Sequence, residues 1–121
     1  MQIAQKNFYK KFLGRVGEKK AADYLRKKGH EILETNFKTV FGEIDIISKD
    51  GQTIVFTEVK TRSSDEFGTP AQAVTEKKQE KYYKVASQYL QKNCKSENLC
   101  RFNVIEIENG QINHILDAFS R

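Results

Sequence analysis

The pattern of apolar and polar positions predicts an order of helix, three strands, helix and two strands. Residues 13–28 place apolar and small side chains at helical spacing, and Gly29 follows as a natural stop. Residues 75–92 repeat the helical pattern, with Thr75 as the expected N-cap. The expected strands span residues 32–38, 42–47, 54–62, 101–107 and 112–116. This order predicts an α/β sandwich around a mixed sheet whose first three strands are antiparallel neighbours.

The second and third strands form a predicted hairpin around Asp50-Gly51, a strong turn signal. If these two residues make the turn, Asp45 faces Phe56 and Glu43 faces Glu58, whereas a three-residue bulged loop would break this register. Alternation then places four charged side chains on one face, at the end away from the turn: Glu43, Asp45, Glu58 and Lys60. The other face is expected to pack as core through Ile44, Ile46, Val55 and Val59.

Acids within so apolar a hairpin need a reason, because a buried charge is costly unless it is paired or binds a metal. Asp45 and Glu58 would be diagonal neighbours, and two such carboxylates repel each other unless one is protonated or a cation lies between them. Hard oxygen ligands suit Mg²⁺ or Mn²⁺. Lys60, one strand step beyond Glu58, would hold an attacking water or stabilise developing negative charge. The set fits phosphodiester hydrolysis.

Spacing alone leaves a structural alternative open. An Asp followed by Glu-x-Lys also arises by chance. In that case Glu58 and Lys60 would form an ion pair on an edge strand, and Asp45 would be an acid at a strand end. The apolar setting, in which Ile54-Val55-Phe56 precedes the acid, favours a functional role.

Length and charge set the broader class. The 121 residues are enough for one domain, residues 1–121, in which residues 1–12 and the loop 62–69 are expected to be mobile. The formal net charge of +5 weakly favours polyanionic partners, although acids are interspersed with the bases. The sequence lacks an apolar run of membrane-spanning length and a secretory signal core, so we expect a cytoplasmic protein with no membrane partner. His30 and His114 lack ligand spacing and are interpreted as surface or satisfied core residues.

Three motifs carry a family resemblance: Gly14-Arg-Val-Gly17-Glu18, Gly42-Glu43-Ile44-Asp45-Ile46-Ile47 and Val55-Phe56-Thr57-Glu58-Val59-Lys60-Thr61-Arg62. In these, and in shorter matches across residues 13–119, the chain resembles the uncharacterised YraN-like family of small bacterial proteins. That family is assigned by fold to the restriction-endonuclease-like, PD-(D/E)xK, superfamily and is similar to archaeal Holliday-junction resolvases. The resemblance therefore implies a restriction-endonuclease-like three-layer sandwich, a mixed central sheet flanked by helices.

The resemblance also implies a function, namely a Mg²⁺- or Mn²⁺-dependent endonuclease acting on DNA, with branched or recombination intermediates as one substrate class. Asp45, Glu58 and Lys60 would be the metal-binding and catalytic triad, and Glu18 would add an acid from the first helix. Glu43 shares the face without an assigned role. Expected nucleic-acid contacts are Arg62, Ser63, Lys78 and Gln79. A homodimer is implied by the resolvases, which are dimers.

Two departures and two rival functions complete the prediction. Ile44 stands where the superfamily name has proline, and Asn103 stands where the family usually has Asp, so we assign Asn103 no catalytic role. The first rival is a nucleic-acid-binding module of the same fold that does not cut. The second is an interaction protein whose buried acids are structural.

Overall fold

The computed structural model describes residues 3–62, 75–93 and 99–119 of the chain. Two helices and five strands follow one another in the predicted order: α1 (Ile3–Lys27), β1 (Glu31–Thr39), β2 (Gly42–Asp50), β3 (Thr53–Arg62), α2 (Glu76–Lys92), β4 (Leu99–Glu108) and β5 (Gln111–Phe119). Thr75 caps α2 as expected, because its hydroxyl accepts a hydrogen bond from the backbone N–H of Lys78 at 3.2 Å.

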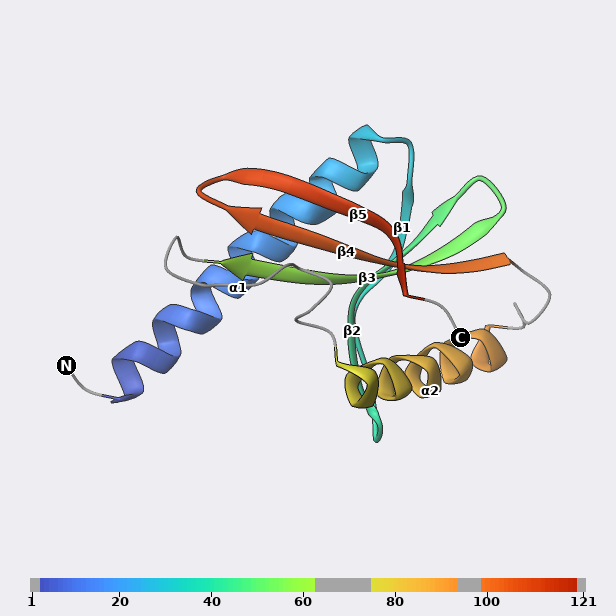
Figure 1. Cartoon of the computed structure of the whole chain (residues 1–121), viewed down its shortest axis with the longest axis horizontal. Helices are drawn as coiled ribbons and strands as arrows, with labels where there is room; N and C mark the ends of the chain where they lie inside the picture. The colour runs from blue at the N-terminus through green and yellow to red at the C-terminus, as the bar shows by residue number, and fades with distance from the viewer. Residues whose placement is uncertain (1–2, 63–74, 94–98, 120–121) are drawn as a thin grey trace.

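The strands form one mixed sheet in the order β1-β2-β3-β4-β5. β3 and β4 run parallel, and the other neighbouring pairs are antiparallel. Helix α1 covers one face and α2 lies against the other (Figure 1). The predicted three-layer α/β sandwich is therefore confirmed. None of the helices in the described ranges combines the length and apolar content that a membrane span requires.

Each helix buries its own apolar cluster against the sheet. On the α2 side, Tyr82, Val85 and Tyr89 pack on side chains that include Phe37 and Phe56. The α1 side is closed by a smaller set: Ala21, Ala22, Leu25, Ile46, Ile105 and Ile107. At Gly17 the helix approaches β3 so closely that an added Cβ would collide with the Thr61 hydroxyl. Small residues on α1 thus bring the neighbouring Glu18 close to the sheet.

Helix α1 begins ten residues earlier than the sequence analysis predicts, at Ile3 instead of Leu13. Residues 3–12, expected to be mobile, are helical. The stretch contains no proline or glycine, so nothing in it breaks a helix that packing already stabilises further along. Of the second segment expected to be mobile, Arg62 ends β3 and residues 63–69 lie outside the described residues.

The hairpin register differs from the prediction by two residues. Asp50 pairs with Thr53, so the loop is Gly51-Gln52, and Phe56 lies opposite Ile47 instead of Asp45. Gly51 has a φ of +61°, which suits the first loop position of a type II′ turn. A shift of two residues preserves the alternation of side chains, so the faces predicted for β3 are unchanged.

The predicted core face of the hairpin is wrong for Ile44. Ile46 and Val59 share a face, on the α1 side, but Ile44 belongs to the α2-side cluster. Two residues apart on one strand, Ile44 and Ile46 should share a face, so β2 departs from regular alternation at Asp45. The neighbouring strand β1 is irregular at the same level, since Asn36 has a φ of +51°.

Candidate metal centre

Asp45 lies where strands β2 and β3 part. Their pairing runs from Asp50 opposite Thr53 to Ile46 opposite Thr57. Beyond that point β2 turns toward α2, whereas β3 continues beside β4 (Figure 1). One oxygen of the Asp45 carboxylate accepts a hydrogen bond from the backbone N–H of Val59 at 2.8 Å, which fixes the acid at the fork.

Three carboxylates converge at this fork. Oxygens of Glu18, Glu43 and Asp45 lie within 4.8 Å of one another, and all three residues are half-buried. The side-chain amide of Asn36 donates to Glu18 at 3.0 Å and to Glu43 at 2.9 Å. The amide thus holds acids from α1 and β2 in one cluster. Glu18, the acid expected from the first helix, thus lies beside Glu43 and Asp45.

The electrostatics of Asp45 follow from this crowding. Burial and the neighbouring Glu58 raise the pKa of the Asp45 carboxyl to about 8, with further contributions from Glu18 and Glu43. The Val59 N–H acts in the opposite direction because it stabilises the charged form. Without a cation, the protonated form of Asp45 is therefore favoured far above the pH at which a carboxyl group ordinarily ionises.

Glu58 faces the cluster from β3 across a groove of about 540 Å³. Its carboxylate is 3.1 Å from the ammonium of Lys78 on α2. The described lining of the groove contains acids and lysines together: Gly42, Glu43, Asp45, Glu58, Thr75, Lys77, Lys78, Lys81 and Tyr82. The predicted face thus brings Asp45 and Glu58 to one groove with Lys78, and Glu18 joins Asp45 from the α1 side.

Other predicted site residues have different surroundings. Lys60 is half-buried on β3, and alternation places it on the same side as Glu58. Arg62 is nearly buried and pairs with Glu106 at 2.8 Å, so its guanidinium is engaged within the sheet. Gln79 is half-buried on α2 but does not line the groove, and Ser63 lies outside the described residues.

Sequence reasoning missed Asn36 and left Glu43 without a role. Asn36 interrupts a strand pattern, and Asn tolerates the left-handed conformation better than other non-glycine residues. The Asn within a predicted strand was the sequence feature that could have indicated a special backbone conformation at this position. Its two acceptors come from elements far apart in the sequence, so spacing alone could not connect them.

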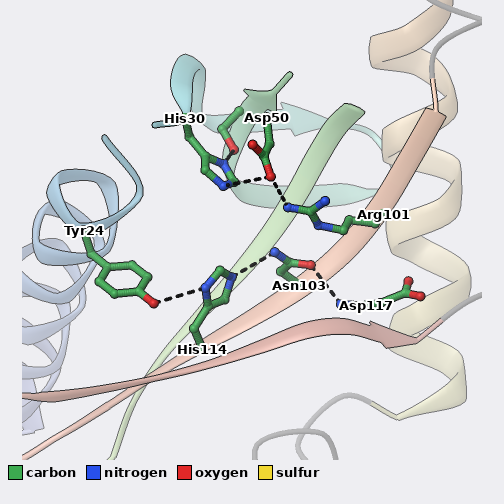
Figure 2. Close-up of polar contacts among 8 residues, drawn as sticks. Tyr24, His30, Asp50, Arg101, Asn103, His114 and Asp117 are labelled. Atoms are coloured by element: carbon green, nitrogen blue, oxygen red, sulfur yellow. Dashed lines mark hydrogen bonds and ion pairs between the residues drawn. The ribbon is translucent and has the colours of Figure 1, made fainter. Parts of the chain in front are cut away.

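Each of the two histidines belongs to a polar network that is separate from the carboxylate cluster (Figure 2). Buried His30 contacts the Ser48 hydroxyl at 2.9 Å, and its other ring nitrogen is 3.6 Å from Asp50, which also pairs with Arg101. His114 contacts the Tyr24 hydroxyl at 3.3 Å and the fully buried Asn103 at 2.9 Å. Their interpretation as satisfied residues is confirmed, and Asn103 takes part in this network instead of the carboxylate cluster.

Comparison with known proteins gives a consistent family. Residues 17–107 match the model of "Uncharacterised protein family UPF0102". A UPF0102 protein of Thermodesulfovibrio yellowstonii is 53% identical over 107 residues, which cover 88% of this chain and 95% of that protein. UPF0102 proteins of Caldicellulosiruptor saccharolyticus and Clostridioides difficile are 45% and 47% identical, each over 108 residues, covering 89% and 88% of this chain and 92% and 95% of theirs. The chain therefore belongs to the UPF0102 family, the YraN-like family that its motifs resemble.

Proposed function

We propose that this protein is a divalent-metal-dependent endonuclease that hydrolyses phosphodiester bonds in nucleic acid, with DNA as its substrate. The observation that carries the proposal is the convergence of Glu18, Glu43 and Asp45 oxygens within 4.8 Å at the fork between β2 and β3. Such a cluster destabilises the metal-free protein, as the raised pKa of Asp45 indicates. A bound cation would offset the repulsion between the carboxylates and would explain why the acids are clustered.

The donor set fits Mg²⁺ or Mn²⁺. All three side chains offer hard carboxylate oxygens, and no histidine or cysteine contributes among the described residues of the cluster. Glu18, Glu43 and Asp45 would hold the ion, with Glu58 facing it across the groove. When bound, the ion would polarise the scissile phosphate and lower the pKa of the attacking water.

The surrounding side chains have distinct proposed tasks. Glu58 would orient the attacking water or complete the ligand set through the carboxylate oxygen that does not pair with Lys78. Lys60, on the same side of β3, would stabilise the negative charge that develops on the phosphate. Lys77, Lys78 and Lys81 line the opposite side of the groove and would bind flanking phosphates.

A binding module that does not cut is the second candidate. It is favoured by the 3.1 Å pair between Lys78 and Glu58, because this pair neutralises one predicted catalytic acid without any metal. The lysines of the groove would then supply salt-dependent affinity for nucleic acid.

A cleavage panel distinguishes the two. Linear, flapped and four-way-junction DNA and structured RNA are incubated with Mg²⁺ or Mn²⁺ and with wild type, Asp45→Asn or Glu58→Gln. We expect either substitution to lower the cleavage rate by at least about 100-fold. The control Asp23→Asn, which removes an exposed acid of α1 that pairs with nearby Arg26, should cut like wild type.

Equal cleavage by wild type and both site variants would refute the proposal. Binding without cleavage by wild type on every substrate, and with either metal, would favour the second candidate. Sedimentation of the protein alone and with duplex tests the homodimer, which would supply one site for each of the two strands.

A further inference from the structure

The tip of the β1–β2 hairpin presents two large apolar side chains to solvent. Val40 is 92% exposed and Phe41 is 39% exposed. The hairpin passes α2, and its tip projects beyond that helix (Figure 1). Exposed apolar side chains are ordinary when they are scattered singly, but here two adjacent ones occupy a tip only four residues from Asp45.

Two contacts support the tip. The Thr39 hydroxyl accepts a hydrogen bond from the backbone N–H of Phe41 at 3.0 Å. The ammonium of Lys84 on α2 lies 5.5 Å from the centre of the Phe41 ring, within cation–π range. A ring supported in this way loses little entropy when a planar partner stacks on its other side.

Two grooves flank the hairpin where it crosses α2. On the β2 side lies the groove of the carboxylate cluster, against the first half of α2. On the β1 side lies a groove of about 640 Å³, against the second half of the helix. Its described lining carries two lysines and no acid: Phe37, Lys38, Thr39, Val40, Gln88, Gln91 and Lys92. The apolar tip therefore lies between the groove of the carboxylate cluster and a groove whose described lining has lysines but no acid.

This arrangement matches a nucleic acid whose strands part. Building on the proposed function, we propose that Val40 and Phe41 stack on the first unpaired base at a branch or duplex end. One strand then enters the groove of Asp45, and the other follows the basic groove of Lys38 and Lys92. Stacking on an aromatic ring tolerates any base, and the lysines bind phosphate, so the surface selects strand separation and not sequence.

The spacing adds a prediction about position. Four strand residues from Phe41 to Asp45 span about 13 Å. The cut should therefore fall within a few nucleotides of the branch, on the strand that enters the groove of Asp45.

The test compares two ligands with the same paired sequence, one fully paired and one ending in two non-complementary arms. Binding is measured in the Asp45→Asn background, so that neither ligand is cut, with 2-aminopurine as the first unpaired base. We expect a preference for the forked ligand that falls about tenfold in Phe41→Ser, together with loss of 2-aminopurine quenching. The matched control Leu99→Ser, which removes an exposed apolar side chain of β4, should keep both properties.

A second variant separates the basic groove from the tip. Lys92→Gln should weaken binding of the forked ligand and reduce its salt slope by about one, but leave binding of the paired ligand unchanged. Thermal unfolding of each variant confirms that the fold is intact.

The proposal is overturned if Phe41→Ser and Leu99→Ser keep the same preference, or if Phe41→Ser changes the sedimenting mass, which would make the tip an interface between copies. Its failure is distinguishable from that of the proposed function. A wild type that cuts with a preference independent of Phe41 refutes only the proposal for the tip. A wild type that does not cut, yet prefers forks through Phe41, supports it and refutes the endonuclease.

Discussion

The Asp45 carboxylate accepts a hydrogen bond from the backbone N–H of Val59, 2.8 Å away, just beyond the last paired residues of β2 and β3. The bond keeps the two strands in contact at the point where they part. It also leaves the acid next to Glu58, whose charge is the second cause of the raised Asp45 pKa after burial. Stability and the candidate metal centre therefore depend on the same side chain.

Replacing Asp45 with Asn should stabilise the metal-free protein at pH 7. The pKa of about 8 in the folded protein exceeds the usual 3.8, so between these values the folded state holds more protons and wild-type stability falls as pH rises. Asn keeps an oxygen for the Val59 N–H but carries no titrating proton. We expect a gain of about 0.5–2 kcal/mol and a flatter pH profile in denaturant unfolding with a chelator present. Asp23→Asn serves as control, and parallel profiles of wild type and Asp45→Asn would contradict the expectation.

Metal binding should release protons. Because Asp45 is protonated at pH 7 and a metal ligand must be ionised, binding of Mn²⁺ should displace close to one proton per ion. Affinity should therefore rise with pH up to about 8 and then level off. Calorimetry in buffers of different ionisation enthalpy measures the released protons. Release by Asp45→Asn equal to that of wild type would place the titrating group elsewhere.

Asn36 should contribute to stability in two ways, through its backbone conformation and through its side-chain amide. Its φ of +51° costs a residue such as Ala about 1–2 kcal/mol, and its side-chain amide donates hydrogen bonds to Glu18 and Glu43. Asn36→Ala should therefore destabilise more than Asn36→Gly, which loses the amide but accepts the conformation. Unfolding of both variants separates the two contributions. Equal losses would assign the whole effect to the amide.

Gly17 should be the glycine of α1 that packing requires. A Cβ at this position collides with the Thr61 hydroxyl, whereas a Cβ at Gly14 meets nothing within 4 Å. Gly17→Ala should cost about 1–3 kcal/mol through overpacking. Gly14→Ala should gain up to about 1 kcal/mol from helix propensity. Thermal unfolding of the two single variants checks the opposite signs, and similar effects would show that α1 can shift away from the sheet.

The sequence pattern predicted the elements, their order and the acids at the centre of the hairpin, because alternation and turn signals are local properties. Register was missed by two residues, since Gly51 satisfies a type II′ turn as well as the Asp50-Gly51 alternative. The two-residue shift left the faces intact, which is why Asp45 and Glu58 were still brought together.

The sequence pattern did not predict the features that arise where β2 and β3 separate. The position of Ile44 on the α2 side and the role of Asn36 arise from the irregularity of β1 and β2 beside Asp45. Strict alternation contains no information about such an irregularity, because it is stabilised by contacts between elements distant in the sequence, namely Glu18 of α1 with Asn36 of β1.

The contact between Asn103 and His114 gives a last prediction (Figure 2). The backbone N–H of Asp117 donates to the Asn103 side-chain oxygen at 3.0 Å, so the amide nitrogen must face the Nε2 atom of His114 at 2.9 Å. An amide N–H can donate only to an unprotonated ring nitrogen, which holds His114 neutral with its proton on Nδ1, toward Tyr24.

Burial is the largest cause of the lowered pKa of His114, followed by the nearby His30, Arg101 and Lys28. A lowered pKa in the folded state means that the unfolded chain binds more protons below its ordinary value of about 6.5. The stability that His114 contributes is thus complete above that value and is lost as pH falls toward the folded-state pKa.

Asn103→Asp should raise the pKa of His114. The new carboxylate would accept a hydrogen bond from the protonated Nε2 atom and so stabilise the charged imidazolium. NMR titration of the imidazole C–H signals measures this pKa directly, with His30→Gln to assign the two histidines. His30 also has a lowered pKa, caused first by burial, and serves as the internal reference. An unchanged pKa of His114 in Asn103→Asp would show that burial alone keeps the ring neutral, and that the orientation of the Asn103 amide has no part in it.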